Sequence, residues 1–574
     1  MAAPDLSTPQ DAGPSPAGGT GPAGPATRSA ESAGGAQPDP TPDTSVETAT
    51  GGTASTTSNT SPTSGPAPDQ AADGPAGSVS ETGSDGTGPT GTPRNHPSAS
   101  TVRRFGMTGA LLMAIGALGA GALPVPNPLF GTRLLGLPSR NATVSIAITY
   151  AGMAMVVLGW LWLGRMLKRD QNGGIPLAKG FITRTMTLWA LPLFVAPPLF
   201  SKDVYSYLAQ SAIAARGMDP YVLGPADALG IDDPLTRSIP TVWRPTPAPY
   251  GPLFLWLGKW ITALTGNDVV LGIFAHRLLA LGGLGLIVWA LPRLAKRLDL
   301  DPRSALWLGV GNPLVLFHLF SGVHNEALML GLMLAGLEVG LARSWLLGTV
   351  IITLGADIKI PAALALGFLG MWVARQRGGR PLEVVKVGAA MAVVFGAVMG
   401  AVAWGTGLGF GWINTLDIPT LIRSWVSVST DLGVVGGQLG VLAGLGDHTT
   451  QVLTLTRALG GLVSAAICVW LLFGTLRGRI DPVTGLGCGL GAVVLLSPTV
   501  HPWYLLWAAI PLAASTARIR YRRLSVAGSA IVALLVPPTG ADFSFRPYQL
   551  PMAIVAGAVI LFVPLWLVRH RIPR

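Results

Sequence analysis

The feature that most constrains this chain is a series of long apolar segments that occupies the sequence from about residue 105 to the C-terminus. Of its 574 residues, 49% are hydrophobic and only 12% are charged, whereas a soluble domain carries about 25% charged residues. Apolar segments of roughly 17–25 residues cross a bilayer as helices. We therefore predict an all-α polytopic membrane protein with about fourteen transmembrane helices, in which interfacial helices and loops cover the outer face.

Two further apolar stretches, 253–264 and 433–445, are predicted to lie in the interface or to re-enter the membrane. Asp357, Lys359 and Pro361 interrupt the apolar pattern near 344–374, which is typical of broken helices beside a cavity. The candidate spans are 107–123, 143–164, 181–199, 268–291, 305–322, 325–342, 344–358, 360–374, 385–404, 453–475, 484–499, 502–516, 524–538 and 552–568.

Lys and Arg residues gather in short clusters between the apolar segments, as in RMLKRD, ARQRGGR and RIRYRR. With a cytoplasmic N-terminus, all of the basic loops fall on the cytoplasmic side, as the positive-inside rule requires. This pattern predicts that both termini are cytoplasmic. It also explains the net charge of +11 without a nucleic-acid partner. The basic loops are 165–180, 293–303, 375–386, 477–481, 518–523 and 569–574.

The first hundred residues have a different composition from the rest of the chain. They are rich in Gly, Pro, Ser, Thr and Ala, and carry ten acidic residues, two Arg and no Lys. Such a segment buries too little apolar surface to offset its chain entropy. We predict a disordered cytoplasmic tail over 1–100, followed by one multispan domain over 101–574.

Two long polar segments, 200–250 and 405–451, lie on the predicted outer face, and candidate chemistry concentrates there. In FSKDVYSYLAQ, the carboxylate of Asp203 is a candidate general base toward a sugar hydroxyl. Asp203, Ser206, Tyr207 and Gln210 follow helical spacing and would share one helix face. The alternative is interfacial anchoring, because Tyr and Lys are enriched at the headgroup level.

The rest of the first outer segment contains GMDPY and TVWRPTPAPY. Asp219 precedes a proline and is expected in a turn, where it could position a sugar or cap local structure. Trp243, Arg244 and Tyr250 lie among prolines, and such a rigid loop suits stacking on sugar rings and pairing with a phosphate. Rigid packing is the alternative for these three side chains.

Two more polar groups stand at the outer ends of candidate spans. In SGVHNEALM, His324, Asn325 and Glu326 are expected to hydrogen-bond substrate, since a His-x-Glu pair alone lacks the ligand number of a metal site. In SPTVHPWYLLW, the imidazole of His501 could donate a hydrogen bond to a phosphate. An aromatic belt at the membrane surface would account for Trp503 and Tyr504 but explains the histidine less well.

Nucleotide-binding and nucleophile motifs are missing from the sequence, and both cysteines, Cys468 and Cys488, fall inside apolar spans. We therefore predict no cofactor, no metal and no disulfide framework.

Five stretches, FSKDVYSYLAQ, GMDPY, YGPLFLWL, NPLVLFHLFSGVHNEALM and SPTVHPWYLLW, resemble the polyprenol-phosphate-mannose-dependent alpha-1,6-mannosyltransferases of actinobacterial cell envelopes, which belong to the GT-C class. The resemblance covers roughly residues 105–570. It implies a plasma-membrane enzyme with an extracytoplasmic active site. Such an enzyme moves mannose by an inverting mechanism from polyprenyl-phosphate-mannose to the mannan of a lipomannan or lipoarabinomannan-type glycolipid.

The resemblance also assigns roles to individual residues. Asp203 matches the essential acidic residue of the first outer loop, and it would act as the catalytic base. Two positions depart from the pattern: Ser211 stands where the family has Gly, and Glu326 stands where it has Asp. The candidate phosphate ligands are Lys202, Arg244 and His501, with Lys359 and Arg423 as weaker candidates. The candidate substrate-binding residues are Tyr205, Tyr207, Gln210, Asp219, Tyr250, His324, Asn325, Glu326, Trp503 and Tyr504.

Two other classes of function stay open on the sequence. A transporter or flippase for a lipid-linked envelope precursor would be expected to show internal repeats and charges near the middle of the bilayer. A structural membrane scaffold would not require His, Glu, Asp and Arg together on one face. The clustering of polar groups at outer span ends favours the transferase over both.

Overall fold

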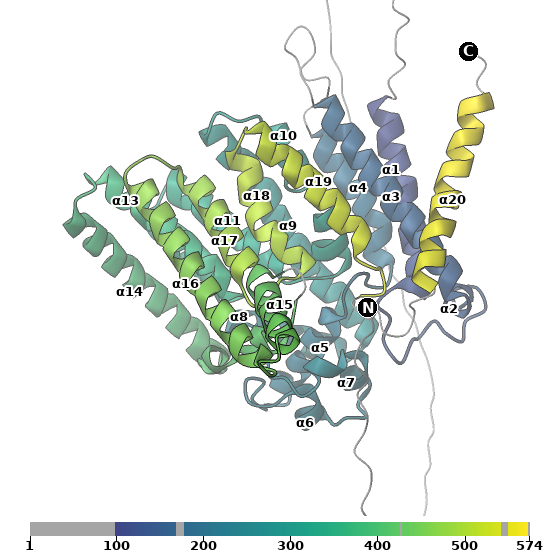
Figure 1. Cartoon of the computed structure of the whole chain (residues 1–574), viewed down its shortest axis with the longest axis horizontal. Helices are drawn as coiled ribbons and strands as arrows, with labels where there is room; N and C mark the ends of the chain where they lie inside the picture. The colour runs from purple at the N-terminus through teal and green to yellow at the C-terminus, as the bar shows by residue number, and fades with distance from the viewer. Residues whose placement is uncertain (1–97, 168–176, 179, 425–426, 541–548, 572–574) are drawn as a thin grey trace, which may run out of the picture. The chain divides into compact units, whose positions relative to one another are not determined.

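The computed structural model describes residues 98–167, 177–178, 180–424, 427–540 and 549–571. These residues form helices and loops, with no strand among them, which agrees with the predicted all-α class (Figure 1). The predicted tail, 1–100, lies almost wholly outside the described residues, as does most of the basic loop 165–180.

The helices follow the predicted apolar segments closely. Each of the fourteen candidate spans coincides with a helix or with a group of consecutive shorter helices. The longer helices are α1 (Ala99–Ala120), α3 (Ala142–Met166), α4 (Phe181–Val195), α8 (Pro252–Thr265), α9 (Val269–Arg297), α11 (Glu326–Ala342), α12 (Trp345–Ala356), α13 (Leu364–Gln376), α14 (Pro381–Thr406), α15 (Val428–Leu442), α16 (Thr449–Leu476), α17 (Pro482–Leu496), α18 (Leu505–Ser515), α19 (Ile519–Leu535) and α20 (Gln549–Arg571).

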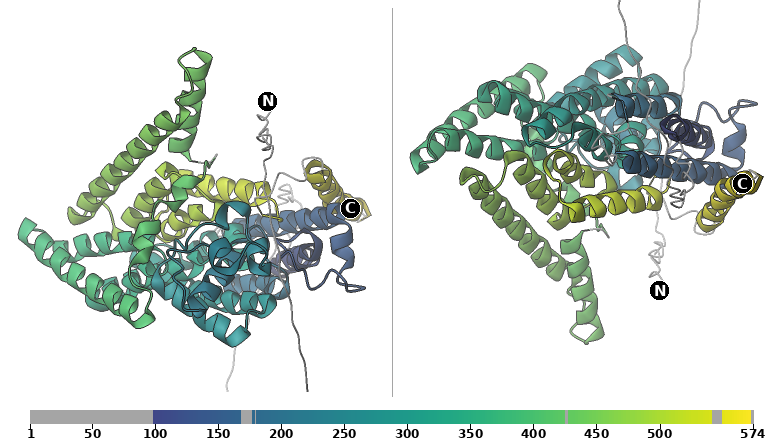
Figure 2. Two further views of the ribbon diagram at one scale, coloured as in Figure 1. Left: turned by 90° about the horizontal axis from the view of Figure 1, so that it is seen from below. Right: turned by 90° about the horizontal axis from the view of Figure 1, so that it is seen from above.

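Shorter helices connect the long ones, and α5, α6 and α7 gather at one end of them (Figure 1). Figure 2 shows the same arrangement from below and from above. The short elements are α2 (Leu137–Arg140), α5 (Asp203–Ala215), α6 (Pro225–Leu229), α7 (Pro234–Ser238), η1 (Thr241–Trp243), α10 (Pro302–Leu308), η2 (Val315–Ser321), η3 (Ile360–Ala363), η4 (Gly411–Thr415), η5 (Ile418–Leu421) and η6 (Pro502–Tyr504).

Four helices in the described part of the chain, α3, α9, α14 and α16, are long and apolar enough to cross a membrane unaided. A fifth span results if η2 and α11, which meet at 108°, are counted together. The chain is thus a membrane protein, while the count of fourteen spans stays a prediction.

The two irregular regions differ from the sequence prediction in opposite ways. The candidate span 305–322 is not one continuous helix, because α10 ends at Leu308 and the π-helical η2 begins only at Val315. The predicted break near 344–374 is confirmed, since α12 ends at Ala356 and η3 begins at Ile360.

Close backbone contact joins the first two long helices, α1 and α3. A Cβ atom added at Gly152 would overlap the backbone oxygen of Gly109 and also the backbone and side chain of Met113. At the end of α3, Trp160 donates to the carbonyl of Trp307 at 3.0 Å, and Trp307 donates to that of Trp160 at 2.8 Å. Small residues such as Gly109 and Gly152 let membrane helices approach as closely as α1 and α3 do here.

We expect Gly152→Ala to lower the melting temperature of the detergent-solubilised protein, because overpacking costs roughly 1–3 kcal/mol. Gly282 on α9 is the matched control, since a Cβ atom there would meet nothing within 4 Å. Gly282→Ala should leave the melting temperature unchanged or raise it, because Ala is the better helix former. Equal melting temperatures for both variants would contradict the packing argument.

Candidate active site

A cavity of about 280 Å³ lies where five separate parts of the chain meet, beside α5. Its wall includes polar side chains from α5, prolines from the loop before α8, and the break between α12 and α13. The lining residues are Asp203, Ser206, Gln210, Trp243, Thr246, Pro247, Pro249, Tyr250, Lys359, Ile360, Pro361, Thr415, Leu416, Ile418, Thr420, Ser497, Pro498, Thr499, His501, Tyr504 and Trp507.

Asp203 is the first residue of α5, and the chain just before it is held firmly. Its backbone N–H donates to Ser201 Oγ at 3.1 Å. Phe200 adopts a φ of 69° and stacks on Phe317 at 5.0 Å between ring centroids. The N–H of Leu199 donates to the carbonyl of Ser321 at 3.3 Å. Contacts with η2 therefore fix the point where α5 begins.

A second strained turn brings His324 to the Asp203 carboxylate. Val323 has a φ of 58°, which is rare for a β-branched residue and is typical of functional sites. The turn between η2 and α11 then places His324 Nδ1 at 3.4 Å from Asp203 Oδ2 and 3.8 Å from Glu326 Oε2. The two carboxylates thus share one buried imidazole.

Lys359 completes this group of charges. Its Nζ lies 2.5 Å from Glu326 Oε1 and donates to the hydroxyl of Tyr504 at 3.4 Å. The ammonium also faces the rings of Tyr250, Tyr504 and Trp507, at 5.7, 4.7 and 5.5 Å from their centroids. These rings favour a cation at this point of the cavity wall.

The environment of Asp203 changes its acidity. Its side chain keeps 24% of its exposure, and burial of the remainder raises the pKa of Asp203 to about 6. The Glu326 charge adds to this shift, while the Ser201 hydrogen bond and Lys359 oppose it. A carboxylate with this pKa is ionised at neutral pH and still accepts a proton readily, as a general base must.

The SPTVHPWYLLW segment also contributes to the wall of the cavity. His501 and Tyr504 line it, and the ring of Trp503 lies between two histidines. Trp503 stacks on His324 at 3.8 Å and on His501 at 4.6 Å between centroids. The predicted residues of this segment are therefore joined to the Asp203 group by ring contacts.

The predicted polar face of α5 is present in part. Asp203, Ser206 and Gln210 line the cavity, whereas Tyr207 packs edge-on against Tyr250 at 5.2 Å. The hydroxyl of Tyr205 donates to the carbonyl of Ala122 at 2.6 Å, away from the lining residues. Tyr205 and Tyr207 therefore hold α5 in place.

Like Tyr205 and Tyr207, three further predicted residues of the first outer segment do not line the cavity. Arg244 donates from Nε to the carbonyl of Ile239 and from Nη2 to that of Arg237, both at 3.0 Å. Asp219 Oδ1 accepts from the N–H of Tyr221 at 2.8 Å, which caps the expected turn. Lys202 is half-buried beside Asp203 but is not a lining residue.

Asn325 is buried next to His324, and neither atom of its amide has a hydrogen-bond partner among the described residues. The second outer segment, 405–451, also reaches the cavity, through four side chains that were not predicted from the sequence: Thr415, Leu416, Ile418 and Thr420. Ser and Thr residues are common in loops, so no sequence signal distinguished these side chains as part of the cavity wall.

Arg423 lies in a neighbouring polar pocket that shares Thr420 and Pro498 with the cavity. The described residues contain no group of three or more side chains suited to a metal ion.

Comparison with known proteins shows which family the chain belongs to. Residues 103–375 match the family model described as alpha-(1→6)-mannopyranosyltransferase, N-terminal domain, and residues 429–566 match the MptB C-terminal domain. A probable alpha-(1→6)-mannopyranosyltransferase of Mycolicibacterium smegmatis is 47% identical over 500 residues, which cover 82% of this chain and 89% of that protein. The chain belongs to the alpha-(1→6)-mannopyranosyltransferase family.

Other members of this family align over a similar length. An alpha-(1→6)-mannopyranosyltransferase of Mycobacterium tuberculosis is 45% identical over 523 residues, covering 82% of this chain and 88% of the relative. Alpha-(1→6)-mannopyranosyltransferase B of Corynebacterium glutamicum is 38% identical over 494 residues, 81% of each chain. No solved structure matches significantly. The chain is thus a mannosyltransferase, which favours the enzyme over the transporter.

We expect Arg244→Ala to loosen the loop between α7 and α8, because it removes two charge-assisted hydrogen bonds to backbone carbonyls. Limited proteolysis should cut this loop about tenfold faster, equivalent to ~1.4 kcal/mol of local stability. Arg216→Ala, a change at the exposed end of α5, is the control. Unchanged cleavage in Arg244→Ala would show that these two bonds do not hold the loop.

Proposed function

We propose that this mannosyltransferase moves mannose from polyprenyl-phosphate-mannose to a growing alpha-1,6-linked mannan chain of a lipomannan or lipoarabinomannan-type glycolipid, with Asp203 as general base. The reaction takes place on the extracytoplasmic face of the plasma membrane. The orientation rests on the basic loops, which the positive-inside rule assigns to the cytoplasm together with both termini.

The observation that carries the proposal is the presence of opposite charges in the wall of one cavity. Among its lining residues, Asp203 and Lys359 are the two with full charges. A sugar phosphate needs a cation near its phosphate and a base near the attacking hydroxyl. The remaining wall is composed of hydroxyl groups, prolines and aromatic rings, which suit the polar edges and apolar faces of sugars.

The reaction follows from these positions. The acceptor hydroxyl attacks the anomeric carbon of mannose, and its proton passes to the Asp203 carboxylate. The bond between that carbon and the phosphate oxygen breaks, and its electron pair leaves on the phosphate. Attack from the side opposite the leaving group converts a beta-linked donor into an alpha-linked product.

Lys359 and His501 are the proposed phosphate ligands. Both line the cavity, and negative charge increases on the phosphate as the glycosidic bond breaks. The two hydrogen bonds of Arg244 to its own loop make this residue a weaker candidate than Lys359. Glu326 holds Lys359 in position through their 2.5 Å contact, and His324 Nδ1 lies 3.4 Å from Asp203 Oδ2. The proposed sugar-binding residues are Tyr250, Gln210 and Tyr504, which also line the cavity.

We predict that Asp203→Asn lowers the rate of mannose transfer at least ~100-fold, since a general base contributes about 10²–10⁴-fold. Membranes containing the variant would be supplied with radiolabelled polyprenyl-phosphate-mannose and a short alpha-1,6-mannoside. Asp219→Asn makes the same chemical change outside the cavity, and an amide oxygen can still accept from the Tyr221 N–H. The Asp219→Asn variant should therefore keep parental activity. Parental turnover in Asp203→Asn would remove Asp203 as the base.

The pKa of Asp203 also predicts a pH dependence. A base with a pKa of about 6 is progressively protonated as the pH falls, so kcat/KM should fall toward tenfold per pH unit below about 6. Initial rates measured between pH 8 and pH 4.5 test this, with Asp219→Asn expected to follow the parental curve. A flat profile down to pH 5 would exclude Asp203 as the titrating base.

A further inference from the structure

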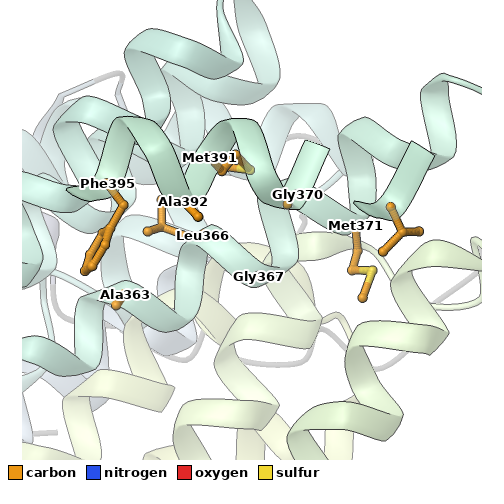
Figure 3. Close-up of a pocket in the computed structure, with 10 residues that line it drawn as sticks. Ala363, Leu366, Gly367, Gly370, Met371, Met391, Ala392 and Phe395 are labelled. Carbon is orange, nitrogen blue, oxygen red and sulfur yellow. The ribbon is translucent and has the colours of Figure 1, made fainter. Parts of the chain in front are cut away.

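A second hollow in the molecule is an apolar groove of about 380 Å³ between α13 and α14 (Figure 3). The groove takes its lining from both helices and contains no polar side chain. Several lining residues are glycine or alanine, whose small side chains leave the space between the two helices unfilled. The lining residues are Ala363, Leu366, Gly367, Gly370, Met371, Val384, Gly388, Met391, Ala392 and Phe395.

The groove and the cavity take lining residues from the same short stretch of chain. Lys359, Ile360 and Pro361 line the cavity, and Ala363, only two residues further along η3, is the first residue of the groove. From Ala363 to Met371 the groove follows α13 for about 12 Å at 1.5 Å per residue. The cavity and the groove are thus lined by consecutive parts of one stretch of chain, and the proposed phosphate ligand Lys359 stands four residues before the groove begins.

The groove also belongs to a part of the molecule that faces lipid. α14 is one of the four helices long and apolar enough to span a membrane. It packs on α8, α12 and α13, and only Val387, Met391, Met399 and Ala403 are buried among its 26 residues. An apolar groove on such a helix lies in the hydrocarbon region, where a water-soluble ligand would not enter.

We propose that this groove holds the isoprenoid chain of the donor while its phosphate lies at Lys359. The inference rests on the proposed function, because it needs a lipid-linked sugar. An isoprenoid carries a methyl branch on each unit, so it needs a wider channel than a straight acyl chain. Gly367, Gly370 and Gly388 provide that width, and the flexible side chains of Met371 and Met391 can adapt to the branches.

The kinetic test fills the groove with a large side chain. Gly388 lies on α14, and a Cβ atom there would meet nothing within 4 Å, so Gly388→Trp should fold. Gly400→Trp is the matched control, because Gly400 is equally open on the same helix but does not line the groove. Each variant would be assayed in detergent with two mannosyl donors, a long one built on solanesyl phosphate and a short one built on geranyl phosphate.

We expect Gly388→Trp to raise KM for the solanesyl donor about tenfold, or ~1.4 kcal/mol, and to leave kcat and the geranyl donor unchanged. Gly400→Trp should match the parent with both donors. An unchanged KM for the solanesyl donor in Gly388→Trp would overturn the proposal. Equal losses in both variants with both donors would indicate that another helix packs on α14, and would also overturn it.

A binding experiment separates this inference from the proposed function. Solanesyl phosphate bearing a diazirine in its chain should label peptides of α13 and α14, and unlabelled solanesyl phosphate should compete for the site. Competition by phosphatidylglycerol to the same extent would reveal a nonspecific lipid crevice and overturn the proposal. Parental protein that is inactive with every mannosyl phosphate would instead defeat the proposed function, while the labelling would still decide whether the groove binds an isoprenoid.

Discussion

The site depends on the contact between Glu326 and Lys359, which joins the start of α11 to the break between α12 and η3. Their side chains are only 1% and 15% exposed. A buried ion pair gains little stability overall, because desolvation opposes the attraction, but removing one partner leaves a costly uncompensated charge. Glu326 and the surrounding aromatic rings therefore fix the Lys359 ammonium at the cavity wall. This ammonium lies at the break between α12 and η3.

The sequence predicted the helices well because each apolar segment forms a local helix whatever its neighbours do. Where a helix starts or stops inside an apolar segment depends on contacts with distant parts of the chain. The span predicted over 305–322 shows this: residues 309–314 interrupt it, and the following π-helix is held against Phe200. The break after α12 was predictable from Asp357, Lys359 and Pro361, because charged residues and proline are unfavourable within a membrane helix.

The site was predictable to the extent that its residues carry charge or stand at helix ends. Asp203, His324, Glu326, His501 and Tyr504 come together although they lie up to 301 positions apart in the sequence. Arg244 has the same charge as Lys359, yet it bonds to its own loop. Sequence shows the charge of a side chain but not which carbonyls it can reach, so the relative importance of these two cations could not be deduced.

Lys359 lines the cavity and stands only four residues before the first residue of the apolar groove. A lipid-linked sugar has a polar head that must reach a base and an apolar chain that must stay out of water. The cavity suits the first and the groove suits the second, and η3 runs from one to the other within five residues, Lys359 to Ala363. The break therefore lets one segment serve both the charged and the apolar part of the same substrate.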